Sequence, residues 1–262
     1  MVDHRAARAQ PQRDRATRTL SEPAILRLSS SVAGALIAGI LVGGSGGRLV
    51  MRLSAIAADD SRVGMLTDNG NRVGAITGEG TVALVLFVGL SSGLAMGIFL
   101  FALRTVLPRR ALPLTVSLVA LGLGSGIVID PGNPDFTILG NRSLNVAMFI
   151  ALFPLFGCMA VWVAERFDTW LERPPLVRLA PLTLVGTVIS AGLGVLGLAL
   201  LGSQNGTLAF VAMVIVIALA VVVSATDGAT ARRARRIASA MLAFATAWGL
   251  VGLARDVAAI IG

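Results

Sequence analysis

Seven long apolar runs, separated by short polar segments, account for most of this 262-residue sequence. A helix rises 1.5 Å per residue, so about 20 apolar residues cross a hydrocarbon core that is about 30 Å thick. Backbone N–H and C=O groups must bond one another inside that core, and a helix satisfies this requirement within one segment. The runs therefore predict an all-α bundle of seven transmembrane helices at residues 31–50, 81–103, 111–129, 144–163, 179–201, 207–223 and 237–254.

The composition agrees with this class of protein. Hydrophobic residues make up 55% of the chain, charged residues only 14%, and the mean hydropathy is +0.84. A soluble domain of ordinary composition is more polar than this. Residues 1–22 are basic and polar and lack the apolar core of a signal peptide, so we expect a disordered cytoplasmic tail before a membrane domain at residues 23–262.

The arginines indicate the orientation of the chain. The sequence contains no lysine, and its positive charge comes from 22 arginines against 14 acids. With the N-terminus inside, most arginines fall on the cytoplasmic side: six before the first run, and then those at 104–110, 166–178 and 232–236. The positive-inside rule then predicts a cytoplasmic N-terminus and an extracytoplasmic C-terminus in a multi-pass protein of the cell membrane.

A repeated polar stretch separates the first two runs. Residues 62–67 read RVGMLT and residues 72–77 read RVGAIT, with DNGN between them. Asn-Gly between two such arms is a strong hairpin signal, because both central residues of a type I′ turn require positive φ. We therefore expect a small extracytoplasmic β-hairpin at residues 62–77, followed by Thr81 as the N-cap of the second helix.

Arg48 and Arg52 are the leading candidates for a binding site. They lie one helical turn apart at the end of the first run and follow a stretch of small residues, GGSGG at 43–47. Two guanidinium groups on one helix face can hold a phosphate or carboxylate. The alternative is that both side chains reach up to the outer lipid headgroups while the glycines pack against another helix. The sequence leaves both interpretations open.

Polar residues of the outer loops form a second, weaker group of candidates. They are Asp68, Asn69, Asn71, Glu79 and Asp130. A turn explains the first three better than a calcium loop does, because the acid spacing and distal Glu of an EF-hand are missing. Asp130 belongs to the segment Asp-Pro-Gly-Asn-Pro, which ends the third helix as a rigid turn or begins a short re-entrant segment, and Ser143 is the expected cap of the fourth. A single cysteine, Cys158, gives no metal site, and no cofactor motif is present.

Three stretches carry a resemblance. GGRLVMRLSAIA, LTDNGNRVGAITGEGT and LGNRSLNVAMF are similar to an uncharacterised group of actinobacterial multi-pass membrane proteins. The resemblance covers the first four helices. It implies a fold and no activity, because none is assigned to that group.

Several functions remain open from the sequence. The first is a module that binds or passes a small anionic solute or a lipid headgroup beside Arg48 and Arg52. The second is a membrane scaffold whose outer hairpin docks a partner by edge pairing. A lipid-active enzyme built on Glu79 and Asp130 has the least support, so the sequence leaves enzymatic activity open and favours a non-enzyme. The expected partner is the lipid bilayer and not a nucleic acid, because the arginines flank apolar spans. The 30 glycines predict close helix packing and favour a homo-oligomer.

Overall fold

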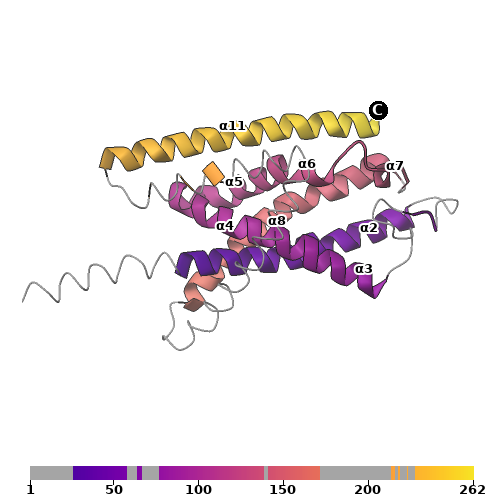
Figure 1. Cartoon of the computed structure of the whole chain (residues 1–262), viewed down its shortest axis with the longest axis horizontal. Coiled ribbons are helices and arrows are strands. Elements are labelled where there is room, and N and C mark those ends of the chain that lie inside the picture. The colour runs from indigo at the N-terminus through magenta and orange to yellow at the C-terminus, as the bar shows by residue number, and fades with distance from the viewer. Residues whose placement is uncertain are drawn as a thin grey trace, which may run out of the picture.

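The computed structural model describes residues 26–57, 64–66, 77–138, 141–171, 214–215, 218, 223 and 228–262. These residues are almost wholly helical and contain no sheet. Within them, four helices are long and apolar enough to cross a membrane: Leu26–Ile56, Val88–Val106, Arg142–Leu171 and Gly228–Ile261. The helices lie roughly side by side along the long axis of the molecule (Figure 1).

The first two helices form a hairpin whose middle sections are wide π-helical stretches. The first helix passes through η1 (Gly39–Gly46) into α2 (Gly47–Ile56). The second begins as α3 (Gly78–Ala83), passes through η3 (Leu84–Leu90) and ends as α4 (Ser91–Val106). The two π stretches pack directly against each other. A π turn commonly marks a functional position in a helix, so this crossing is a distinctive part of the bundle.

Glycines make that crossing possible. Gly89, Gly93 and Gly97 recur every four residues on the second helix. A Cβ added to Gly93 would lie 2.8 Å from the carbonyl oxygen of Ala35, and one added to Gly97 would lie 2.7 Å from the Cα of Val32. Helix backbones approach this closely in membranes through small residues at four-residue spacing. The expected close packing is therefore present, and we call this contact the glycine seam.

The third helix is also interrupted by a π stretch. It runs from the 3-10 turn η4 (Arg109–Ala111) through α5 (Leu112–Val119), η5 (Ala120–Gly124) and α6 (Ser125–Val128). The predicted stop at residues 130–134 is confirmed: the Gly132 N–H donates to the Asp130 carboxylate at 2.8 Å, and the Asp135 N–H donates to the Asn133 side chain at 2.8 Å. The turn leads into the short helix α7 (Asp135–Ile138).

Two long helices complete the described bundle. α8 (Arg142–Leu171) continues past Pro154 and extends beyond the predicted end at residue 163. α11 (Gly228–Ile261) lies along one edge of the molecule (Figure 1). Phe136 of α7 is buried between these two helices with Val146 and Leu253, so the turn after the third helix is held against protein.

Two predicted caps are wrong, one by four residues and one by two. The second helix starts at Gly78, and the Thr77 hydroxyl accepts from the Gly80 N–H at 3.2 Å, whereas Thr81 lies inside the first turn. α8 starts at Arg142, and Asn141 rather than Ser143 accepts from the Leu144 N–H, at 3.2 Å. In both cases a suitable polar residue precedes the expected one, so the helix gains additional backbone hydrogen bonds by starting earlier.

Other expectations fall mainly on undescribed residues. The predicted spans 179–201 and 207–223 lie almost entirely outside the described residues, as do residues 1–22 and most of the hairpin at 62–77. The third predicted span, 111–129, is present as the interrupted helix from α5 to α6.

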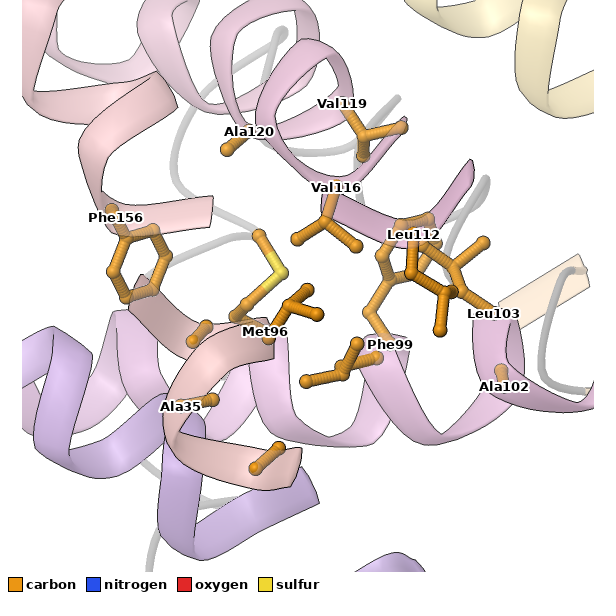
Figure 2. Close-up of a cluster of buried hydrophobic side chains, with 14 of the residues drawn as sticks. Ala35, Met96, Phe99, Ala102, Leu103, Leu112, Val116, Val119, Ala120 and Phe156 are labelled. Atoms are coloured by element: carbon orange, nitrogen blue, oxygen red, sulfur yellow. The ribbon is translucent and has the colours of Figure 1, made fainter. Parts of the chain in front are cut away.

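The hydrophobic core lies where the first helix, α4, α5 and α8 meet (Figure 2). Met96 of α4 occupies its middle, close to Val116 of α5 and Phe156 of α8 in the close-up. Ala238 and Leu242 attach α11 to the same cluster. This core separates two polar ends of the bundle, and the candidate sites lie at those ends.

Candidate functional site

Arg48 is buried along one edge of its guanidinium group. It lies in α2, just beyond the π stretch, and its side chain is half-buried. Its Nε and Nη2 atoms are shielded from solvent and have no hydrogen-bond partner among the described residues. These two nitrogens form one edge of the planar group, and their N–H bonds point the same way. That edge matches the two oxygens of a carboxylate or phosphate.

An unpartnered guanidinium edge is costly. Burying a charge without an opposite charge or hydrogen bonds removes its hydration and gives nothing in return. Arg48 belongs to a helix that is apolar enough to span a membrane, where this cost is greater than at a protein surface. The arrangement therefore suits an anion that supplies two oxygens to this edge.

Arg52 has a different environment. It lies one turn beyond Arg48 on α2, and its side chain is exposed and makes an interaction of its own. The structure thus places the two predicted arginines on consecutive turns, as expected, but gives them different roles. Of the two, only Arg48 has a buried edge without a described partner; Arg52 adds positive charge one turn away.

The remaining side of α2 is fixed to α8. Gly47, Val50 and Ser54 are buried, and the Ser54 hydroxyl donates to the side-chain oxygen of the buried Asn145. A buried hydrogen bond of this kind orients two helices, because leaving either group unpaired is unfavourable. It holds α2, and with it Arg48, at a fixed rotation beside α8.

The predicted outer-loop residues do not form a described cluster. Asp68, Asn69 and Asn71 lie outside the described residues, and for Glu79 only the backbone, in the first turn of α3, is described. Asp130 is exposed and accepts a hydrogen bond from its own turn. No group of three or more metal-binding side chains occurs in the described part of the chain.

Asp130 does have an acidic neighbour. Asp256 of α11 is half-buried and interacts electrostatically with Asp130 at this end of the bundle. At the same end, Arg142 of α8 donates a hydrogen bond to the Ile260 carbonyl oxygen of α11 at 3.4 Å. This end of the bundle therefore carries a mixture of charges.

The opposite end contains a polar cluster that the sequence analysis missed. Arg104 of α4 forms an ion pair with Asp168 of α8, and their side chains are only 7% and 20% exposed. Arg104 Nη1 also donates to Ser30 Oγ at 3.0 Å and to Ser31 Oγ at 3.2 Å, and Ser30 Oγ donates to Asp168 Oδ1 at 2.5 Å. These four side chains connect the first helix, α4 and α8, and we call them the inner bolt. The sequence signal for this cluster was Asp168, an acid in the last turns of an otherwise apolar helix.

Charge is distributed unequally between the two ends. The described residues of the inner-bolt end include the arginines at 27, 104, 109, 110, 166, 232, 233, 235 and 236, with Glu165 and Asp168 as acids. At the other end, the arginines at 48, 52, 142 and 255 face an equal number of acids, at 79, 130, 135 and 256. One end of the bundle is thus strongly basic and the other nearly balanced. This is the asymmetry that the positive-inside rule describes.

Comparison of the chain with protein-family models, with curated proteins and with solved structures finds no match.

Proposed function

We propose that this protein is a multi-pass protein of the cell membrane that binds an anionic group, a lipid headgroup or a small anionic solute, at Arg48. The observation that carries the proposal is the buried Nε–Nη2 edge of Arg48, which has no partner in the described structure. Two parallel N–H groups select a ligand with two adjacent oxygens on one centre, such as a phosphate or a carboxylate.

The topology that we propose has seven spans with a cytoplasmic N-terminus, and an outer hairpin between the first two. Two features support it. The inner-bolt end carries most of the described arginines. In addition, α8 ends and α11 begins at that same end (Figure 1). An even number of crossings between them is compatible with this arrangement, and we assign these to the two apolar runs at 179–201 and 207–223. The resemblance to the actinobacterial group remains a proposal of the same kind.

Permeation is the natural extension of binding. The first helix carries Arg48 near one end and Ser30 and Ser31 of the inner bolt near the other. Their separation of about 18 residues corresponds to about 27 Å, close to the thickness of a hydrocarbon core. We propose that the bundle accepts its anion from the Arg48 end while the inner bolt closes the opposite end.

The test is native mass spectrometry of the detergent-released protein, wild type beside Arg48→Gln. We expect the wild type to retain one anionic ligand, as phosphatidylglycerol or as a small acid, and the variant to lose it. Loss of a charged, bidentate contact corresponds to about a 10- to 100-fold weaker affinity. Titration with phosphatidylglycerol and, separately, with inorganic phosphate distinguishes a headgroup from a solute by which of them raises the unfolding temperature.

Arg255→Gln is the matched control, because Arg255 is an exposed arginine at the same end of the bundle. It should retain the ligand and whichever thermal response the wild type shows. A wild type that carries no anion and responds to neither probe would overturn the proposal, as would equal losses in the Arg48 and Arg255 variants.

A further inference from the structure

A second anion site is suggested by the exposed surface of α8 at the basic end. Trp162 is 57% exposed, and the Cζ atom of Arg166 lies 5.4 Å from the centre of its ring. Arg166 is itself exposed, and it has no acid within ion-pair distance among the described residues. The pair is therefore open to whatever surrounds the bundle.

The contact with Trp162 leaves Arg166 able to bind an anion. The face of the indole ring attracts the guanidinium charge, and none of the described hydrogen bonds or ion pairs occupies the N–H groups of Arg166. Stacking also fixes the long side chain, which reduces the entropy lost when an anion is bound. Trp162 thus holds Arg166 in place without occupying its hydrogen-bonding edge.

The position of Arg166 and Trp162 along the bundle axis indicates which part of the membrane surrounds them. Asp168 of the inner bolt is only two residues further along α8, a rise of about 3 Å. Exposed charged side chains gather at this end, with Glu165 and Arg166 on α8 and Arg109 and Arg110 after α4. Exposed charges are unfavourable in hydrocarbon, so this level of α8 marks where the hydrocarbon layer ends. Arg166 lies at that boundary, and Trp162 lies one turn into the apolar layer. Tryptophan is enriched at this depth, and lipid phosphates lie just outside it.

We propose that Arg166 and Trp162 form a binding site for the phosphate of an anionic phospholipid in the leaflet next to the inner bolt. The charge of this end favours such a lipid, because its described arginines greatly outnumber Glu165 and Asp168. Glu165 adjoins Arg166 in sequence but projects about 100° around the helix. The phosphate binds the in-plane edge of Arg166, and the acyl chains lie along the exposed apolar surface that includes Leu155.

The site can be tested by fluorescence quenching in vesicles. Trp170→Phe with Trp248→Phe leaves Trp162 as the only tryptophan of the full-length protein. Its quenching is measured in vesicles of dioleoyl-phosphatidylcholine that contain brominated phosphatidylglycerol or, separately, brominated phosphatidylcholine. We expect brominated phosphatidylglycerol to quench Trp162 preferentially, with an affinity about fivefold higher, as one arginine near an anionic surface gives.

Arg166→Gln in this background should remove the preference. Arg233→Gln is the matched control, because Arg233 is an exposed arginine at the same end with no stacked aromatic ring among the described contacts. It should preserve the preference. Equal quenching by the two lipids before any arginine is changed would overturn the proposal. Equal losses in the two arginine variants would overturn it as well, because they would show diffuse attraction rather than a site.

Discussion

At the scale of single residues, the two arginines Arg48 and Arg104 differ in whether their buried guanidinium nitrogens have hydrogen-bond partners. Arg104 is almost fully buried, and every described contact of its guanidinium group is to Asp168 or to a serine hydroxyl. Arg48 buries two nitrogens with no such partners. A satisfied buried charge fixes structure, whereas an unsatisfied one is a functional candidate with a stability cost.

That contrast gives a prediction for Arg48. In ligand-free protein, Arg48→Leu should leave the free energy of unfolding unchanged or raise it, because it removes a buried charge that lacks a described partner. The midpoint of thermal unfolding in detergent, after exhaustive delipidation, measures the effect. A fall of several degrees would instead show that Arg48 supports the fold, and the proposed anion would then be unnecessary.

The inner bolt gives the opposite prediction. Arg104→Gln should lower the free energy of unfolding by about 2–3 kcal/mol, slightly below the range for fully buried pairs, because Asp168 retains 20% exposure. Combining it with Asp168→Asn should cost less than the sum of the single changes, since the second change removes the stranded charge. Glu165→Gln, an exposed acid on the same helix, is the control. Strict additivity in the double-mutant cycle would contradict a coupled pair.

At the scale of elements, the apolar runs located the described helices, and the ends of these helices were the less predictable part. Hydropathy reports where a helix is buried in lipid, but the helix itself continues as long as its backbone hydrogen bonds are favourable. α8 and α11 therefore extend several residues beyond their predicted spans. The π stretches had no sequence signal that we could interpret, because they depend on how one helix packs against another.

The glycine seam supplies a prediction about packing. Gly39→Ala should destabilise the protein by about 1–3 kcal/mol, because the new Cβ would overlap the carbonyl oxygen of Gly89 and force the two helices apart. Gly252→Ala in α11 is the control, since a Cβ there meets nothing within 4 Å. Thermal unfolding of both variants in the same detergent compares them. An unchanged midpoint for Gly39→Ala would show that the two helices are not in close contact.

At the scale of the whole molecule, the sequence predicted the basic end of the bundle well, because loop arginines can be counted without knowing the fold. The placement of Arg48 and Arg52 on consecutive turns of one helix also followed from their spacing. The inner bolt was not predicted, since Ser30, Arg104 and Asp168 are brought together only when three helices pack. The same holds for the stacking of Arg166 on Trp162, whose four-residue spacing is common to many helical pairs that do not touch.

The orientation of the whole chain can be measured directly. In a Cys158→Ala background, Gly262→Cys should react with a membrane-impermeant maleimide in intact cells, and Thr230→Cys should react only after permeabilisation. These positions lie at opposite ends of α11, and the arginines beside position 230 favour the cytoplasm. The reverse pattern would place the N-terminus outside, and reaction of both in intact cells would show that α11 does not cross the membrane.

The glycine seam also has a consequence for how this gene can vary. Every missense change of a glycine codon encodes a residue with a Cβ, so no such change is conservative at Gly39, Gly93 or Gly97, where that atom would lie less than 3.0 Å from the facing backbone. A saturation mutagenesis experiment should therefore show intolerance at position 39 and at positions 93 and 97, which are four codons apart. Such a pattern would trace the line where two helices touch without any structural measurement.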